Sequence, residues 1–561
     1  ALTGSLTLNH LDTGVTVLTG TQDYTGNTNV RQGVLIFDDA NAPNLQSLFL
    51  GTNAGDNASM IIRNGSNVAV NNNTRVGHIA DSDGHLVVTG AGTTLDLPRI
   101  DVGRAGFGIL EVTDGAVVDA TYLVVIGDTI DSVGNVTVSG QGSRLITQHV
   151  YLSQFGDGVL SVVDGGVVEA SNYLSLATSP IATGTVNIGD GGAAGILDTP
   201  EITTGSGDAT VNFNHTDSDY YLTRDGTADG DAVLLKGGLK VIHHNTGTTT
   251  LLGTHSYTGN TNVTAGTLLV NGTIAHSDFH VFGSGTLGGT GTVGNLLMSD
   301  GILSPGNSIG TFTVDGDYTH GSFATLYVEI IDGGHTPGVH NDHVYVTGEA
   351  TILGGKVDVF AEPGNYHDGT QYTILTADGG VDGKFDTVSS NLFDVALSYT
   401  AHDVLLTLTL DDKFTPPGDD DDDDWTGHFE QLARSGGQRG VGRVIDHLLP
   451  HATGDLAFVF NELAGLDDAN ARDAIQQLSG ETTGASSTAV VQATTSARNT
   501  VFNRSRPAVA SLALPGPATS FQGGSLSLAS ADTQQSARQL ADMSGPTGWL
   551  GWVQGYGEYG D

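Results

Sequence analysis

Cysteine is absent from this 561-residue chain, so disulfide bonds, thiolate metal sites and cysteine nucleophiles are excluded. Basic residues are scarce: 20 lysines and arginines stand against 62 acidic residues, and the formal net charge is −42. Because a field of this sign repels phosphate backbones, we expect no nucleic-acid partner. No apolar run reaches the ~18 residues that a membrane-spanning helix needs.

Glycine is abundant, with 81 residues, and it has no three-residue period of the collagen kind. Five glycines open the same short pattern, Gly-x-[Leu/Val]-x-[Val/Ile], which recurs about every 25 residues. They are Gly84, Gly108, Gly134, Gly158 and Gly184. A fixed period of this length is typical of proteins built from stacked repeats.

Each repeat contains three short stretches of alternating apolar residues, separated by turn residues. In the second repeat these stretches are 109–112, 116–119 and 122–126, and Asp114-Gly115 supplies the first turn. Three strands in about 25 residues predict an all-β, right-handed parallel β-helix, in which each coil stacks on the next at ~4.8 Å. A β-propeller is the alternative, but its blades need four strands in about 40–45 residues.

A second repeat, Tyr-Thr-Gly-Asn-Thr-Asn-Val, occurs at 24–30 and again at 257–263. With Gly33 and Gly266 it resembles the autotransporter-associated β-strand repeat, and the shorter repeated units are similar to repeats of type V secretion passengers. Residues 283–318, which contain Leu-Ser-Pro-Gly-Asn-Ser-Ile-Gly-Thr at 303–311, resemble the C-terminal part of such a passenger. Residues 343–359 and 372–387 share that likeness.

The later residues resemble the rest of an autotransporter in the same order. Residues 428–480 are similar to the helical segment that precedes the barrel, and 551–557 look like its first strand. The family continues into a membrane barrel, so we expect that barrel to be missing from this chain, whose last residue, Asp561, falls inside the first strand. The resemblance implies export through the outer membrane and an extracellular or cell-surface location.

Composition divides the chain into six predicted segments. Six consecutive aspartates after Pro-Pro-Gly mark a solvated linker, because adjacent like charges without turns make no calcium cage. The segments are a β-helix passenger (1–280), a C-terminal passenger block of autochaperone type (281–412), the acidic linker (413–424), an α-helical pre-barrel segment (425–506), a flexible linker (507–548) and a truncated barrel strand (549–561).

Helical periodicity appears only after the acidic linker. Val441, Val444, Ile445 and Leu448 are spaced as one apolar face, and Pro450 should end that helix. A second helix is predicted from Asp455 through Leu463, a third from Asp467 to Leu478, and a slim fourth over 484–506.

Three motifs contain residue types that could carry chemistry. Gly306-Asn307-Ser308-Ile309-Gly310 fits the G-x-S-x-G pattern, but no helix is expected after it. His335, His340 and His343 with Asp342 could converge on a metal, although turn-exposed histidines are the simpler interpretation. The densest acidic group outside the linker, a possible polysaccharide-cleaving cluster, comprises Asp217, Asp219, Asp225, Asp229 and Asp231.

None of these motifs is assigned a role: we expect no catalytic residue, no cofactor, no metal and no enzyme activity. The resemblance and the repeats predict a secreted, surface-displayed passenger that acts as an adhesin or as a self-associating aggregation or biofilm factor. Its partners would be other copies of itself or the surface of a host or neighbouring cell. A structural fibre or stalk, and a polysaccharide-acting enzyme, remain the alternatives.

Overall fold

The computed structural model describes residues 1–409 except 363 and 365, and also 428–449, 463, 466 and 468–478. All of them belong to the first of two compact units, Ala1–Glu481. Among these residues, no helix has both the length and the apolar character needed to cross a membrane. The predicted linkers at 413–424 and 507–548, the helix at 484–506 and the barrel strand at 549–561 lie outside the described residues.

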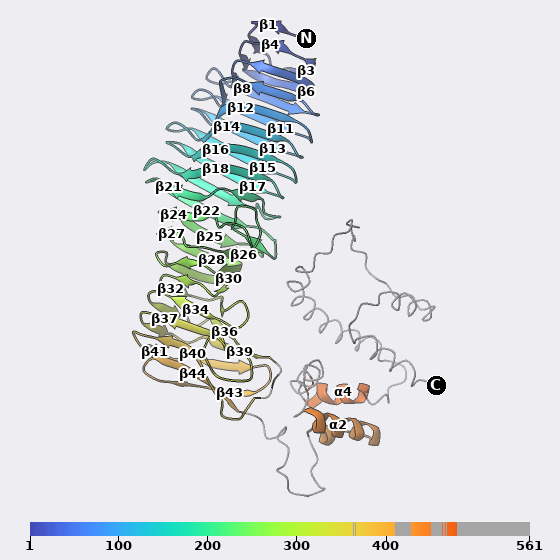
Figure 1. Ribbon diagram of the computed structural model, residues 1–561, viewed down its shortest axis with the longest axis vertical. Coiled ribbons are helices and arrows are strands. Elements are labelled where there is room, and N and C mark those ends of the chain that lie inside the picture. Colours follow the sequence, from blue (N-terminus) through green and yellow to red (C-terminus); the bar gives the residue numbers. More distant parts are fainter. Residues whose placement is uncertain are drawn as a thin grey trace, which may run out of the picture. The chain divides into compact units, whose positions relative to one another are not determined.

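Strands stack in parallel register over most of residues 1–409, which confirms the predicted all-β parallel β-helix (Figure 1). Successive coils place Leu110, Val136, Leu160 and Val186 side by side, and all four side chains are buried. Each such ladder continues from coil to coil, so one narrow apolar core runs along the stack. A single coil has no partner for this face, and the core therefore exists only because coils stack.

The first half of the stack contains the following strands: β1 (Thr3–Gly4), β2 (Leu8–His10), β3 (Val15–Thr21), β4 (Asp23–Tyr24), β5 (Thr28–Val30), β6 (Gln32–Leu45), β7 (Leu48–Leu50), β8 (Asn57–Arg63), β9 (Asn67–Val70), β10 (Asn73–Val76), β11 (Asp83–Thr89), β12 (Thr94–Val102), β13 (Phe107–Thr113), β14 (Val117–Ile126), β15 (Val133–Ser139), β16 (Arg144–Leu152), β17 (Asp157–Val163), β18 (Val167–Leu176), β19 (Thr183–Ile188), β20 (Ile196–Asp198), β21 (Glu201–Thr204) and β22 (Asp208–Asn214).

The second half contains β23 (Tyr220–Tyr221), β24 (Leu234–Gly237), β25 (Lys240–His244), β26 (Thr248–Leu251), β27 (Ser256–Tyr257), β28 (Thr261–Val270), β29 (Thr273–Ile274), β30 (Phe279–Gly289), β31 (Thr292–Val293), β32 (Leu296–Met298), β33 (Ile302–Pro305), β34 (Thr311–Val314), β35 (Tyr318–His320), β36 (Thr325–Ile330), β37 (His343–Val346), β38 (Ala350–Ile352), β39 (Lys356–Ala361), β40 (Gln371–Ala377), β41 (Val381–Gly383), β42 (Thr387–Ser390), β43 (Asp394–Tyr399) and β44 (Asp403–Thr409).

The five repeat glycines form one ladder, because Gly84, Gly108, Gly134, Gly158 and Gly184 occupy the same register position in adjacent coils. A Cβ atom added at Gly134 would lie 2.3 Å from Val102 O and 2.7 Å from Gly127 N. Any side chain here would therefore collide with the backbone of the preceding coil. The period found in the sequence marks a place where the backbones of two coils approach closely.

Two of the three predicted pieces of each regular coil form one continuous strand. In the second repeat β14 extends through both the 116–119 and the 122–126 stretch, and its pairing with β16 shifts register between Ala120 and Leu123. The chain turns a corner there without breaking the hydrogen-bond ladder. No turn residue marks that corner, which explains why the alternation alone suggested two strands.

The two copies of Tyr-Thr-Gly-Asn-Thr-Asn-Val build the same local structure. Tyr24 Oη lies 2.6 Å from Thr28 Oγ1, and Tyr257 Oη lies 2.6 Å from Thr261 Oγ1. All four residues are fully buried, so each hydroxyl pair satisfies polar atoms inside the core. The repeated tyrosine and threonine are therefore structural residues of the interior.

The C-terminal end of the stack departs from a uniform parallel helix. β44 pairs antiparallel with β40 on one side and with β43 on the other. The turn between β43 and β44 is short, because Tyr399 is the register partner of Val404. The last strands thus depart from the predicted parallel β-helix and end in an antiparallel hairpin.

The helices after the acidic linker are α1 (His428–Leu432), α2 (Gly436–Leu448) and α4 (Asp468–Leu478). Ser435 caps α2 by accepting from Gln438 N, and the helix ends just before Pro450, as predicted. Ile445 is buried against α1 and α4, whereas Val444 is 55% exposed. The prediction of Val444 on the apolar face is therefore wrong. The helix predicted from Asp455 lies almost wholly outside the described residues.

Candidate functional site

The G-x-S-x-G motif lies in a loop between two strands, β33 and β34. Asp342 is buried beside this loop, where its Oδ1 accepts from Gly310 N at 2.9 Å and its Oδ2 accepts from Glu329 N at 2.9 Å. Burial raises the pKa of Asp342 to about 8, although the two amide donors oppose that shift. Asp342 therefore fixes the fold of the loop that carries Ser308.

The three histidines of the second motif have separate surroundings. His335 is exposed, and His340 Nδ1 accepts from Thr336 N at 3.2 Å. His343 is buried, its Nε2 lies 3.1 Å from Thr376 Oγ1, and burial lowers its pKa to about 4. In the part of the chain that the structure describes, no group of three or more histidine or acidic side chains is placed to hold a metal ion.

The histidine–hydroxyl pair also has the wrong direction for nucleophile activation. Thr376 Oγ1 donates its proton to Asp403 Oδ1 at 2.9 Å, so the ring nitrogen of His343 must donate to this hydroxyl. A general base has to accept the proton of its nucleophile. These three side chains therefore tie β37, β40 and β44 together and do not form a catalytic arrangement.

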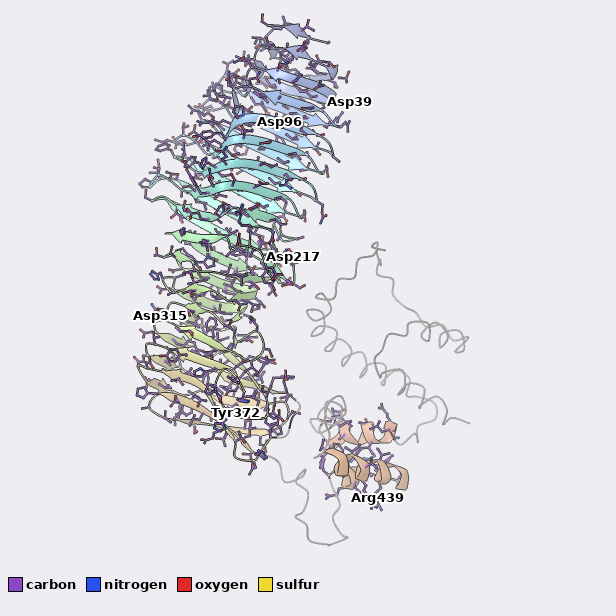
Figure 2. The ribbon with its side chains drawn as sticks, in the orientation of Figure 1. Asp39, Asp96, Asp217, Asp315, Tyr372 and Arg439 are labelled. Carbon is purple, nitrogen blue, oxygen red and sulfur yellow. The ribbon has the colours of Figure 1, made fainter. Side chains whose placement is uncertain are left out.

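The acidic group at 217–231 does not converge either. Asp217 accepts from Ala194 N at 2.7 Å, whereas Asp225 accepts from Thr227 N at 3.0 Å, which lowers the pKa of Asp225. Asp219 lies beside Tyr221, while Asp229 and Asp231 are exposed. Figure 2 shows Asp39, Asp96, Asp217 and Asp315 spread along the stack and not gathered at one place.

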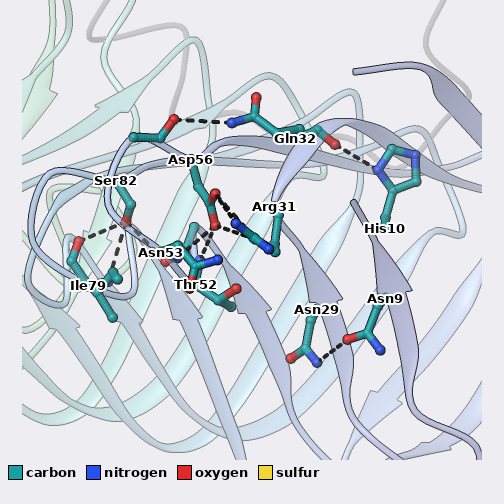
Figure 3. A network of polar contacts seen from close by, with 12 residues as sticks. Asn9, His10, Asn29, Arg31, Gln32, Thr52, Asn53, Asp56, Ile79 and Ser82 are labelled. Atoms are coloured by element: carbon teal, nitrogen blue, oxygen red, sulfur yellow. Dashed lines mark hydrogen bonds and ion pairs between the residues drawn. The ribbon is translucent and has the colours of Figure 1, made fainter. Parts of the chain in front are cut away.

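Polar side chains near the N-terminal end of the stack form a network that holds the coil corners (Figure 3). Asp56 is buried, accepts from Thr52 N at 2.9 Å and Asn53 N at 2.7 Å, and pairs with Arg31 at 3.3 Å. Ser82 Oγ donates to Gly51 O at 3.0 Å. The contacts of Asp56 and Ser82 join corner loops to their own or the neighbouring coil, and Asn29 Nδ2 donates to Asn9 Oδ1 at 2.7 Å between β5 and β2, so the network is structural.

The outward side of one sheet carries a different set of residues, which sequence reasoning missed. We call it the arginine–tyrosine face, and it comprises the side chains of Phe49, Arg75, His78, Arg99, Arg104, Tyr122, His149, Tyr151 and Tyr173. They project from β7, β10, β12, β14, β16 and β18 and the corners that follow β10 and β12. The last four of these strands are stacked one above another in Figure 1.

Arginines dominate the N-terminal half of the face. Arg99 Nε donates to Asp101 Oδ1 at 2.6 Å, and Arg75 Nε lies 3.5 Å from the other oxygen of that carboxylate. Arg104 Nε lies 3.1 Å from Asp128 Oδ2. The Asp101 side chain is 1% exposed, whereas those of Arg75 and Arg99 are 28% and 36% exposed. The carboxylate lies beneath, and the charge that faces solvent is positive.

Aromatic rings dominate the C-terminal half. The ring of His149 lies 5.8 Å from that of Tyr122 and 4.6 Å from that of Tyr173. Tyr151 Oη lies 2.7 Å from Tyr173 Oη, and this hydrogen bond is the main cause that raises the pKa of Tyr173 to about 12. Tyr122 is 56% exposed. The rings thus form one connected surface over three successive coils.

A signal for this face was present in the sequence. His149 and Tyr173 lie one repeat apart along the chain, and they are register partners in adjacent coils. Arg75, Arg99 and Arg104 cluster within little more than one repeat, although lysine and arginine together number only 20 in the whole chain. Comparing outward positions from coil to coil would have found both groups, whereas a search for catalytic motifs passed over them.

Comparison with known proteins gives partial likenesses. No family model matches the chain. An extracellular serine protease of Serratia marcescens is 31% identical over 214 residues, which are 36% of this chain and 18% of that protein. The adhesin BmaC autotransporter of Brucella suis biovar 1 (strain 1330) is 30% identical over 211 residues, 36% of this chain and 6% of the relative.

A second extracellular serine protease of Serratia marcescens is 28% identical over 209 residues, covering 36% of this chain and 19% of its own length. The chain therefore spans less than a fifth of the relatives it matches. These names contradict the expectation that the chain is not an enzyme, because two of the relatives are proteases. That expectation rested on the lack of a recognisable catalytic motif in the repeats. The likeness to the proteases extends over about a third of the chain and does not require such a motif.

About a third of the chain is thus similar to autotransporter-type proteins, one of them an adhesin, and this likeness supports an extracellular or cell-surface location in general terms.

Proposed function

We propose that this chain is the β-helical part of a surface-displayed autotransporter passenger and that it acts as an adhesin or self-associating aggregation factor. The observation that supports this role most directly is the arginine–tyrosine face, an exposed surface of the residue types that are enriched in binding interfaces. One of the similar proteins is named an adhesin autotransporter.

Multivalency explains how a modest face would give adhesion. Many copies displayed on one cell present the same face repeatedly, so weak contacts add through high effective concentration. The stack holds the face on a rigid scaffold, since its strands are paired on both sides by neighbouring coils. Little conformational entropy is then lost when a ligand binds.

Adhesion is tested by displaying the chain on a non-adherent bacterial cell and measuring sedimentation and attachment to other cells. We expect faster sedimentation or attachment than for cells that display an unrelated β-helix. Because copies of net charge −42 repel one another, self-association should strengthen as salt rises from about 0.01 M to 0.15 M and the Debye length falls from ~30 to ~8 Å. No gain in sedimentation or attachment at any salt concentration would refute the proposal.

Proteolysis is the second candidate function, and it rests on the two relatives named extracellular serine proteases. In that case the stack would serve as the scaffold of a secreted enzyme. A fluorophosphonate probe, which labels activated serines, distinguishes the candidates: covalent labelling of the protein, lost on heat denaturation, supports proteolysis. A Ser308→Ala variant tells whether that serine is the labelled one.

A further inference from the structure

We propose that the arginine–tyrosine face binds a linear polysaccharide that carries carboxylate groups, of the polyuronate class, lying along the axis of the stack. This inference rests on the proposed adhesive function and names its ligand.

Charge distribution supports an anionic ligand. Arg75 and Arg99 share one buried carboxylate, Asp101, so two guanidinium groups stand over a single negative charge. Their forked donors match the geometry of a carboxylate, and the two side chains are partly exposed to solvent, at 28% and 36%. The exposed acids near the face are Asp81 and Asp131, which lie in corner loops, and Asp96, which precedes the register shift between Leu97 and Arg99 in β12. Beyond that shift, the partly exposed side chains of Arg75 and Arg99 offer local positive charge on a chain of net charge −42.

The aromatic half of the face suits a sugar. Pyranose rings have one apolar side of C–H groups and a rim of hydroxyls, and tyrosine offers an apolar ring with a polar tip. Tyr122 is 56% exposed, with its ring 5.8 Å from His149, so it projects beside a supporting layer of rings. The hydrogen-bonded hydroxyls of Tyr151 and Tyr173 fix that layer.

Linear geometry favours a polymer. The register Asn73, Arg99, Leu123, His149 and Tyr173 runs through five successive coils, which at ~4.8 Å per step span about 19 Å. A sugar unit in a polysaccharide repeats on nearly the same length as one coil. A chain lying along the axis would therefore meet arginines at one end of the face and tyrosines at the other in a constant register.

A polypeptide fits this face less well. β12, β14 and β16 are each paired with strands on both sides, so no free edge remains for a peptide to add as an extra strand. Stable protein interfaces bury about 800 Å² per partner around an apolar centre. The only large apolar side chain of this face that is more than half exposed is Tyr122.

The test is calorimetric titration of the full chain with polygalacturonate oligosaccharides, with dextran oligosaccharides as the uncharged probe. We expect Tyr122→Ala and Arg99→Gln each to weaken polygalacturonate binding about tenfold, the effect of about 1.4 kcal/mol. Arg99→Lys, which keeps the charge but loses the fork, should bind with intermediate affinity. The matched controls are Phe323→Ala, at an 83% exposed aromatic, and Arg144→Gln, at an exposed arginine paired with Glu169; both should bind like the original chain.

Thermal unfolding checks that each variant is folded. If Arg99→Gln does not fold, the Tyr122→Ala variant still tests the inference. Equal affinity of all variants, equal affinity for dextran, or no binding of either sugar would overturn the inference. Adhesion that persists without inhibition by soluble polygalacturonate would overturn the inference but leave the proposed function standing. Loss of adhesion in the Tyr122→Ala variant without any sugar binding would instead indicate a protein partner and would also overturn it.

Discussion

Replacing Gly134 by alanine should destabilise the coils around β15. The added Cβ would lie 2.3 Å from Val102 O, 2.7 Å from Gly127 N and 2.8 Å from the Ile126 Cγ2 methyl group. Gly127 N donates to that same carbonyl, Val102 O, at 2.9 Å, so the new methyl group would be wedged against both atoms of an inter-coil hydrogen bond.

The expected size follows from two terms. Overpacking a close-packed interior costs about 1–3 kcal/mol, and a lost backbone hydrogen bond costs about 1 kcal/mol more. The sum, about 2–4 kcal/mol, should fall on the coils next to Gly134, because repeat proteins are stabilised mainly by contacts between neighbouring repeats.

Amide hydrogen exchange measured along the full chain suits this prediction, since a long repeat array need not unfold in one step. Exchange in β13, β15 and β17 should quicken by roughly a hundredfold, the equivalent of about 2.8 kcal/mol. Gly238→Ala is the control, because a Cβ at Gly238 would meet no atom within 4 Å. Similar exchange in the two variants would refute the collision argument.

Three further predictions concern the interior and the helices. Burial lowers the pKa of each of four histidines, His243, His255, His320 and His343, to about 4. These four rings should make stability fall as pH drops from about 6.5 toward 4, because the unfolded chain takes up protons that the folded chain refuses. Asp342, whose pKa burial raises to about 8, acts in the opposite direction and lowers stability as pH rises toward 8. Acid denaturation followed by circular dichroism would detect the net loss, on the order of 3 kcal/mol for each of four rings against one opposing carboxyl, and a flat profile between pH 6.5 and 4 would contradict it. Tyr24→Phe should speed amide exchange around β5 more than Tyr257→Phe speeds it around β28. The reason is that the Thr261 hydroxyl keeps a second partner, Ser277 Oγ at 2.8 Å, whereas the contacts of the described residues give the Thr28 hydroxyl no partner besides Tyr24. The opposite order of exchange rates would count against this explanation. Asp446→Asn should weaken the packing of α1 on α2 by about 1–2 kcal/mol, because the carboxylate accepts from Phe429 N at 3.0 Å and Glu430 N at 2.8 Å. Unaltered hydrogen exchange at these two amides would show that the charge of Asp446 is not needed to hold α1.

The fold was predictable because the glycine period and the inward apolar positions are imposed by the same contact between coils. A glycine is required wherever the backbone of the preceding coil lies too close for a Cβ, and that requirement repeats once per coil from Gly84 to Gly184, whereas Ala58 and Ala209 hold the same register position in the coils on either side. The corner between Ala120 and Leu123 was not predictable, since no glycine or proline marks it. The antiparallel end was not predictable either, because the alternation of apolar and polar residues in β43 and β44 is the same for either strand direction.

The arginine–tyrosine face escaped for another reason. Its residues come from six strands and their corners, and none of them forms a motif along the chain. Their proximity depends on coils of nearly equal length in this part of the stack, which bring Tyr151 beside Tyr173 and the strand of Arg75 beside that of Arg99. The acidic and histidine motifs, by contrast, were conspicuous in the sequence and proved to stabilise loops and strand contacts.

The antiparallel hairpin at the end of the stack has a consequence for the direction of folding. β43 and β44 are close in sequence, so they find each other after closing only a short loop, whereas parallel neighbours must close loops of about a whole coil. The hairpin can therefore form first. The free edge of β44 is then available to pair with β40, the strand that pairs with it from earlier in the chain. We expect assembly to proceed from the C-terminal end toward the N-terminus, each coil serving as the template for the one before it.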